Sequence, residues 1–301
     1  MLGYKVCPYL KNKGSAVRFC LWPLMKYIEK AIFFFVKSIL KSFSFRKKGD
    51  LEFIQRVVDY GNNLLGKGSL GTQNKKEIVF VSKFINEKPK IIIDVGAHEG
   101  KYSEELLKNF DTEKLYLFEP SRHSFNKLVS KFQNNKNVII VNKGLSDEDG
   151  WVSLYAPEQG SVFSSIYKRN LDHYNVQFSK KEKAEMIAFD SFYKSKLNNE
   201  VIDLLKLDVE GNELLALKGL SKSIEYIKII QFEFGGSNID SRTYFQDFYY
   251  FFKENNFDIY RMRPYGLTKL NHYFENDEVF RYSNFIALNN RFYNNYEKSN
   301  Y

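Results

Sequence analysis

Short runs of apolar residues alternate with amphipathic segments from residue 91 to near the end of the chain. The runs are four to nine residues long and rich in β-branched side chains, which predicts strands buried on both faces. Between them, apolar residues recur every three or four positions, which predicts helices that cover a sheet. Strands that alternate with helices indicate an α/β fold with a doubly wound, mostly parallel sheet.

The pattern gives approximate bounds for each element. We expect strands at 91–95, 115–118, 138–141, 201–209, 226–234, 257–262 and 283–288, and helices at 102–109, 125–132, 212–220 and 243–255. A hairpin-like stretch at 151–155 and a run at 186–189 interrupt the alternation. In a doubly wound sheet ligands bind beyond the carboxyl ends of the strands, so the residues directly after each strand are the candidates for function.

Two further segments precede this region. Residues 51–90 predict a helical lead-in, with an amphipathic helix, a glycine-rich loop and a second helix that ends before Pro89. Residues 1–50 form a basic amphipathic N-terminal segment, so the chain is expected to consist of parts 1–50, 51–90 and 91–301.

The charge is distributed unevenly along the chain. The net charge is +9, and the first fifty residues account for all of it because they hold eleven Lys or Arg and two acids. Residues 51–301 hold 34 charges of each sign, so the body lacks the basic footprint of a nucleic-acid-binding protein, and no nucleic-acid partner is expected. Two cysteines, Cys7 and Cys20, exclude a disulfide scaffold and indicate a reducing, cytoplasmic location.

Residues 20–48 carry a wide apolar face opposite a lysine stripe. Lys26, Lys30, Lys37 and Lys41 fall within an arc of about 60° if this segment is helical. The apolar run is too short and too often interrupted for a signal peptide or a membrane span. Two interpretations stay open: a helix that lies peripherally in the inner face of the membrane, or one that docks on its own domain or a partner. The sequence leaves the oligomeric state open.

The first predicted strand ends in Asp94-Val95-Gly96-Ala97-His98-Glu99-Gly100. The glycines allow a tight turn and a close approach of the backbone to a ligand. The spacing differs from the G-x-G-x-x-G of dinucleotide loops, and an acid precedes the turn. A carboxylate there would repel a pyrophosphate, whereas it suits a ligand with an ammonium or sulfonium group.

The second predicted strand ends in Phe118-Glu119-Pro120, where an acid can accept both hydroxyls of a ribose. The loop acid, the glycine turn and the ribose acid together indicate S-adenosylmethionine rather than NAD. In the structural alternative, Asp94 and Glu119 cap helices. The third strand leads to Ser146 and Asp147, where an adenine edge would fall, although this stretch is also typical of an ordinary turn.

Further acids follow the later strands. Lys206, Asp208 and Glu210 share one face of a predicted strand and its exit, and Glu233 precedes Gly235 and Gly236 at the end of the next one. Charges at the end of a buried strand are costly unless they are paired or used. A structural alternative is that Glu210 or Asn212 caps the following helix.

These motifs together resemble the FkbM-type family of S-adenosylmethionine-dependent methyltransferases. The resemblance covers about residues 91–288, and its most distinctive part is the run Asp208-Val209-Glu210-Gly211-Asn212-Glu213. It implies a Rossmann-like class I methyltransferase domain at 91–301, with O-methylation of a hydroxyl on a sugar or secondary metabolite. His98 stands where the family commonly carries Asn. The implied cofactor-binding residues are Asp94, Gly96, Ala97, His98, Gly100, Tyr102, Glu119, Pro120, Ser121, Ser146, Asp147 and Asp208.

Methyl transfer to an alcohol needs alignment of the reactants and a base that takes the hydroxyl proton. Asp208 and Glu210 are the first candidates for the base and for orienting the acceptor, and Glu233 is the next. No His or Cys cluster with metal-ligand spacing occurs, so no metal is expected. Residues 160–169 are a candidate lid. The acceptor is expected to be a hydroxyl of a carbohydrate, in a glycan or glycolipid.

Two other function classes remain as alternatives. A nicotinamide-dependent sugar oxidoreductase would share the sheet, but it should carry G-x-G-x-x-G. A non-catalytic binding module tethered to a membrane would explain the N-terminal segment, but not the acids that follow the strands.

Overall fold

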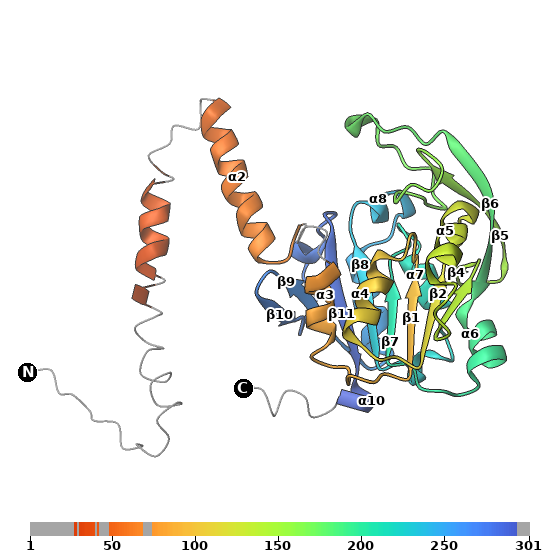
Figure 1. The fold of residues 1–301 in the computed structure, drawn as a ribbon. Coiled ribbons are helices and arrows are strands. Elements are labelled where there is room, and N and C mark those ends of the chain that lie inside the picture. The colour runs from red at the N-terminus through yellow and green to blue at the C-terminus, as the bar shows by residue number, and fades with distance from the viewer. Residues whose placement is uncertain (1–26, 29, 40, 42–47, 69–73, 294–301) are drawn as a thin grey trace, which may run out of the picture. The chain divides into compact units, whose positions relative to one another are not determined.

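The computed structural model describes residues 27–28, 30–39, 41, 48–68 and 74–293 (Figure 1). The chain divides into two compact units, Met1–Asp59 and Tyr60–Tyr301. Cys7, Cys20, Lys26 and the basic residues at 46–47, on which part of the N-terminal prediction rests, lie outside the described residues.

An eight-stranded sheet forms the centre of the second unit. Its strand order is β10-β9-β11-β8-β7-β1-β2-β3, with parallel pairing from β8 through β3 and antiparallel pairing at the other edge (Figure 1). The strands are β1 Ile91–Val95, β2 Lys114–Phe118, β3 Val138–Val141, β7 Leu204–Leu207, β8 Ile229–Phe234, β9 Phe257–Arg263, β10 Gly266–Lys269 and β11 Ser283–Asn289. The predicted doubly wound, mostly parallel sheet is therefore confirmed.

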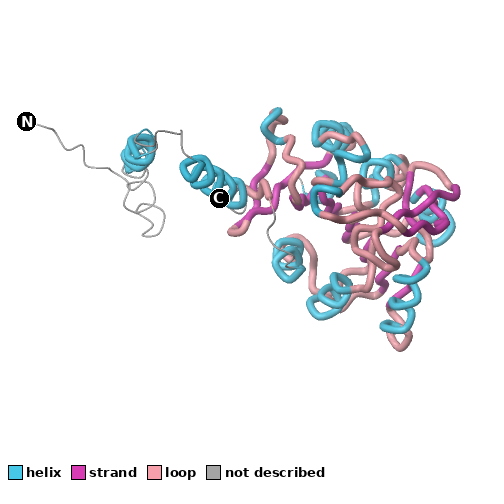
Figure 2. Tube along the Cα trace, turned by 90° about the horizontal axis from the view of Figure 1, so that it is seen from above, coloured by secondary structure: helices cyan, strands magenta, loops and turns pink. Residues whose placement is uncertain are grey.

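Helices cover both faces of this sheet, as Figure 2 shows. On one face α3, α4 and α5 pack on alternate side chains such as Ile92, Leu117 and Leu204. On the other face α6, α7 and α9 pack on the intervening ones, such as Ile93 and Phe232. The helices of this unit are α3 Asn74–Val81, α4 Lys101–Asn109, α5 Arg122–Phe132, α6 Phe189–Phe192, α7 Glu213–Lys218, α8 Ser237–Ser241, α9 Phe245–Glu254 and α10 Asn290–Tyr293, with single turns η1 Asp172–Tyr174, η2 Tyr193–Leu197, η3 Ile224–Tyr226 and η4 Glu275–Asp277.

A second, three-stranded sheet interrupts the alternation between β3 and β7. It consists of β4 Gly144–Ser146, β5 Gly150–Ala156 and β6 Lys180–Ala188 in the order β4-β6-β5. The predicted hairpin-like stretch at 151–155 lies in β5, and the run predicted at 186–189 is the end of β6 and the first residue of α6. The chain between β5 and β6 contains residues 160–169, which we call the strap.

The first unit is helical where it is described. Residues 27–28, 30–39 and 41 have helical geometry, and α2, which spans Lys48–Leu64, begins in this unit and ends in the second. The large apolar side chains of the first segment are exposed, from 41% at Val36 to 73% at Tyr27. Within the described part of the chain, none of the helices combines the length and the apolar character that crossing a bilayer requires.

Candidate functional site

The polar residues predicted at the strand ends meet at one edge of the central sheet. The register pairs Asp94 with Lys206 and Lys206 with Gln231, so three neighbouring strands present these side chains at the same level. Glu233 comes two residues further along β8 and therefore on the same face, and Asp208 directly follows the last residue of β7. Strand alternation alone brings acids that are far apart in sequence to one place.

Lys206 lies at the centre of this group. Its ammonium is 3.0 Å from the Asp208 carboxylate, 3.5 Å from that of Asp94, and 4.7 Å from the centre of the Tyr102 ring. Burial by itself would lower the pKa of Lys206, but the Asp208 and Asp94 carboxylates outweigh burial and raise it. Lys206 therefore remains a cation that holds two acids.

The loop after β1 has the geometry that its glycines predicted. Gly96 has φ +79, and a Cβ there would come within 1.9 Å of the Asp208 carbonyl oxygen, so the two loops touch at this point. The Gly96 and Ala97 amides both donate to the Phe118 carbonyl, and Ser103 donates to Asp94 at 2.5 Å. Asp94 Oδ1 is buried and lacks a hydrogen-bond partner. This oxygen beside the turn is the one that the Lys206 ammonium approaches to 3.5 Å.

Glu119 links this loop to the one after β2. Its two carboxylate oxygens accept from the His98 amide at 2.8 Å and from the Ser121 amide at 2.9 Å. Burial raises the pKa of Glu119 to about 7, against these two hydrogen bonds. Ser121 is the N-cap residue of α5, so Glu119 also accepts from the backbone amide at the start of that helix, and Asp94 accepts from the side chain of Ser103 in α4.

The loops enclose a pocket beyond the ends of β1, β2 and β7. Predicted residues that line it include Gly96, His98, Glu119, Pro120, Asp208 and Glu210. Asp94, Ala97, Gly100, Tyr102, Ser121, Ser146, Asp147 and Glu233 are not in its lining. Of these, Tyr102 lies beneath it and donates to Gln231 at 2.6 Å, while Ser146 donates to Asp147 at 3.0 Å.

Sequence reasoning missed several pocket residues. Leu154, Met186 and Asn212 line the pocket. Asn212 donates to the Leu145 carbonyl at 2.7 Å, and its Oδ1 is buried without a hydrogen-bond partner. The distinctive run from Asp208 to Glu213 contains Asn212, and this was the available signal. Glu213, not Glu210 or Asn212, closes the turn by accepting from the Val209 and Gly211 amides.

The three candidate catalytic acids have different surroundings. Burial, followed by the neighbouring Asp208 carboxylate, raises the pKa of Glu233 well above its usual value, and Glu233 hydrogen-bonds Asp208. Burial and Asp208 raise the pKa of Glu210 to about 8, although the Arg169 guanidinium opposes this shift. Asp208 is ion-paired with Lys206, and its side chain is 33% exposed.

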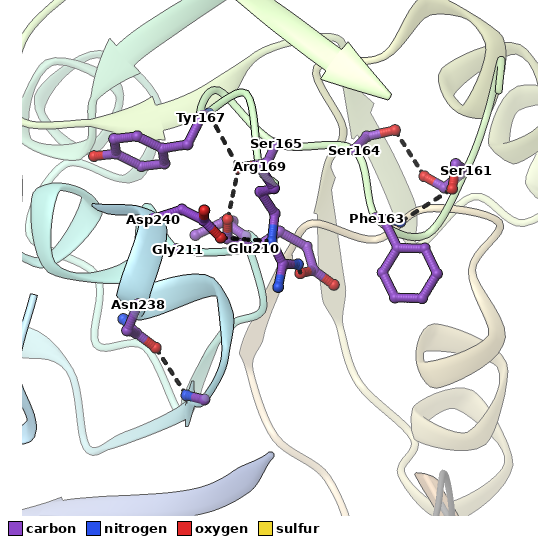
Figure 3. Close-up of polar contacts among 12 residues, drawn as sticks. Ser161, Phe163, Ser164, Ser165, Tyr167, Arg169, Glu210, Gly211, Asn238 and Asp240 are labelled. Atoms are coloured by element: carbon purple, nitrogen blue, oxygen red, sulfur yellow. Dashed lines mark hydrogen bonds and ion pairs between the residues drawn. The ribbon is translucent and has the colours of Figure 1, made fainter. Parts of the chain in front are cut away.

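The strap crosses the pocket, to whose lining Ser161, Val162, Ser164 and Ile166 contribute. At its start the Gly160 carbonyl contacts His98 Nε2 at 2.9 Å. At its end Arg169 contacts Glu210 at 2.9 Å and Asp240 at 3.0 Å, between the turn after β7 and α8 (Figure 3). Ser165 also donates to the Glu210 carbonyl at 2.7 Å. Both ends of the strap are therefore fixed over the pocket.

Among the residues that the structure describes, no group of three or more His, Cys, Asp or Glu side chains could hold a metal ion. The buried acids are instead paired with lysine, arginine, amides or one another.

The doubly wound sheet with a pocket at the ends of its strands defines the Rossmann-like class of enzymes. A sequence model described as "Methyltransferase FkbM domain" matches residues 94–259, more than half of the chain. The chain therefore belongs to the FkbM methyltransferase family. The predicted family and enzyme class, an S-adenosylmethionine-dependent methyltransferase, are confirmed.

Solved structures with a similar fold include methyltransferases from several organisms. Methyltransferase FkbM from Methylobacillus flagellatus is 15% identical with a TM-score of 0.39, and the match covers 68% of this chain and 45% of that chain. An rRNA methylase from Streptococcus thermophilus is 12% identical with a TM-score of 0.40, covering 74% and 99%. TrmK from M. capricolum, solved with S-adenosylhomocysteine, is 14% identical with a TM-score of 0.39, covering 73% and 68%. No curated protein sequence matches the chain.

Proposed function

We propose that this protein binds S-adenosylmethionine in the pocket and transfers its methyl group to a hydroxyl of a carbohydrate acceptor. The observation that carries the proposal is the pair of acids beside the Gly96 turn. Asp208 lines the pocket, whereas Asp94 is fully buried, and its Oδ1 has no hydrogen-bond partner and lies 3.5 Å from the Lys206 ammonium, so one lysine faces two acids. A cationic ligand would compensate these acids, whereas a pyrophosphate would be repelled.

The surroundings fit the parts of this cofactor. Asp94 and the Gly96 turn would hold the methionine part, and Glu119 would accept the ribose hydroxyls. Asn212, with a free buried acceptor oxygen, and the adjacent Leu145 would face the adenine. Ser146 and Asp147 directly follow Leu145, but they do not line the pocket. They would therefore contribute to adenine binding only by shaping the backbone of this turn.

Asp208, Glu233 and Glu210 would have different roles in methyl transfer. S-adenosylmethionine supplies an electrophilic methyl group when it is bound. Asp208 is our candidate for accepting the hydroxyl proton, because its carboxylate lines the pocket and Lys206 keeps it oriented. Glu233, which has a raised pKa and a hydrogen bond to Asp208, would keep its proton and orient Asp208. Glu210 would hold the strap through Arg169.

The choice of acceptor rests on charge. Residues 51–301 are neutral overall, which favours an uncharged hydroxyl acceptor over a polyanion. Some structural neighbours are RNA methylases, and RNA is therefore an outcome that the test must separate.

The N-terminal unit suggests where the acceptor lies. Exposed Ile28, Ile32 and Phe35 accompany Lys30, Lys37 and Lys41 on the described helix, a composition that suits an anionic membrane surface. We propose that the protein is peripheral on the inner face of the membrane and acts on a lipid-linked sugar.

Two measurements test the proposed function. Titration calorimetry should give binding heat with S-adenosylmethionine and none with NAD, and heat with NAD alone would favour the oxidoreductase. Incubation with the methyl-labelled cofactor and separate glycolipid, glycan and RNA fractions should label the glycolipid or glycan fraction. Label in RNA alone would reject the carbohydrate, and absence of all transfer despite cofactor binding would favour a binding module.

A further inference from the structure

The lead-in helix α3 contributes a buried acid to the active-site edge of the sheet. Glu77 is 5% exposed, and it lies outside the segment that the family model matches. Its two oxygens accept from Gln231 at 2.8 Å and from Asn284 at 3.0 Å, on the adjacent strands β8 and β11. An ionised carboxylate can accept from both amides at once, and these hydrogen bonds are stronger than those to a neutral side chain.

Glu77 completes a polar ladder that runs across the sheet. Asp94, Lys206 and Gln231 are at one level on β1, β7 and β8, and Asn284 pairs with Glu233 one level higher. Tyr102 ties the ladder to α4, because its hydroxyl donates to Gln231 and its ring lies under Lys206. The Glu77 carboxylate is therefore part of the same electrostatic group as Asp94 and as Asp208, which lines the pocket.

The charges of this ladder do not cancel. Lys206 supplies one positive charge, whereas Asp94, Asp208 and Glu77 can each supply a negative one. In a buried site such an excess acts over several ångströms because little water screens it. S-adenosylmethionine carries a positive sulfonium, and its product S-adenosylhomocysteine is neutral at sulfur, so an excess of negative charge favours the substrate over the product.

We propose that Glu77 is a specificity-determining residue that makes the pocket prefer the charged cofactor over its neutral product. The inference rests on the proposed function, because it takes S-adenosylmethionine as the ligand. It adds a residue of the lead-in to the cofactor site without requiring contact between Glu77 and the cofactor.

The test compares the affinities of the full-length protein for S-adenosylmethionine and S-adenosylhomocysteine by calorimetry. In Glu77→Gln we expect the affinity for S-adenosylmethionine to fall about tenfold more than that for S-adenosylhomocysteine. A purely structural role would weaken both alike, and an equal loss would overturn the proposal. Glu104→Gln, a partly exposed acid of α4 paired with Lys131, is the matched control and should leave both affinities unchanged.

A second variant tests whether the charge itself matters. The double variant Glu77→Gln with Asn284→Asp exchanges the two partners of one hydrogen bond. The carboxylate is then at position 284 on β11, and the new amide at position 77 on α3 can donate to it. We expect this double variant to recover most of the preference for the charged cofactor. A folded double variant without recovery would contradict the inference.

The pH dependence provides a measurement on the unmodified protein. Burial raises the pKa of Glu77 to about 7, although Lys206 opposes the shift. The titratable groups that face Glu77 are Lys206 on β7, Asp208 directly after β7, Asp94 on β1, Tyr102 on α4 and Tyr282 next to β11. Glu77 becomes ionised as the pH rises through 7, so the preference should increase between pH 6 and pH 8.

This increase should be smaller in Glu77→Gln. If neither variant folds, a preference in the wild type that stays constant over this pH range overturns the proposal. Failure of the wild type to bind either cofactor form would instead reject the proposed function, and the two failures are therefore distinguishable.

Discussion

The Arg169 guanidinium lies 2.9 Å from the Glu210 carboxylate and joins the strap to the turn that follows β7. The Arg169 side chain is 9% exposed, and the same guanidinium also holds Asp240 at 3.0 Å. Two acids and the strap therefore share one buried cation, and the strap can open only if this cation is separated from both.

Replacement of Arg169 should loosen the strap. In Arg169→Ala we expect S-adenosylhomocysteine to dissociate about tenfold faster, because Glu210 and Asp240 no longer hold the strap over the pocket. Stopped-flow displacement measures this rate. Lys168→Ala, an exposed neighbour on the strap, is the control. Equal dissociation rates in Arg169→Ala and the wild type would show that the ion pairs do not hold the pocket closed.

Asp208→Asn should separate binding from turnover. Loss of the proposed base should lower methyl transfer to the labelled fraction by about 10²–10⁴-fold. Binding of S-adenosylhomocysteine should remain measurable, because Asp94 and Glu119 are unchanged. Glu210→Gln should affect transfer less, since its carboxylate is paired with Arg169. Asp172→Asn, in an exposed turn, serves as the control. Unchanged transfer in Asp208→Asn would remove this residue from the mechanism.

Cofactor affinity should rise as the pH passes about 7. Burial raises the pKa of Glu119 to about 7, so the group is protonated below this pH and ionised above it. The ionised carboxylate is the better acceptor for ribose hydroxyls. Calorimetry with S-adenosylhomocysteine between pH 6 and pH 8 should show the rise, and Glu119→Gln should reduce it. Glu99→Gln, in the neighbouring loop after β1 and paired with Lys127, should preserve it. A rise of the same size in Glu119→Gln would assign the effect to another group.

Gly96→Ala should destabilise the protein. The backbone has φ +79, and the new Cβ would lie 1.9 Å from the Asp208 carbonyl oxygen. We expect the free energy of unfolding in urea to fall by more than about 2 kcal/mol. Gly150→Ala, where nothing lies within 4 Å of the added Cβ, is the control. Similar urea midpoints for the two variants would mean that the turn adapts without cost.

Membrane binding should depend on the lysines of the N-terminal helix. Reversing Lys30, Lys37 and Lys41 to glutamate should lower sedimentation with phosphatidylglycerol vesicles by more than about tenfold. The same reversals at exposed Lys136, Lys180 and Lys222 should have little effect. If both triple variants sediment alike, the apolar helix has another partner, such as a second copy of the chain.

The sequence predicts local elements better than the relations between them. Strands 91–95 and 138–141 coincide with β1 and β3, because each is an isolated run rich in β-branched residues, although β1 is buried and β3 is half-buried. The strand predicted at 201–209 is shorter, since the continuous strand is Leu204–Leu207, Ile202 makes only an isolated bridge to Ile227, and Asp208 belongs to the turn. Short polar segments at strand ends carry no period from which a boundary could be read.

In the candidate site, too, residues marked by a local sequence pattern could be predicted, whereas residues defined by tertiary contacts could not. Asp94, Glu119 and Asp208 could be found because each directly follows or ends a predicted strand. Glu77 could not, because a single acid on the short lead-in helix becomes meaningful only when the register places Gln231 and Asn284 opposite it. The ion pair of Glu210 with Arg169 likewise depends on the path of the strap, which no local pattern encodes.

The position of Glu77 and Asn284 on opposite sides of the matched segment bears on protein engineering. A fragment trimmed to residues 94–259 would lose both partners of the hydrogen bond at the far end of the ladder. Chimaeras that graft this segment into a related scaffold would leave the Gln231 amide without its acceptor, unless the recipient supplies an equivalent acid and amide. The transplantable unit therefore begins before α3 and extends through β11.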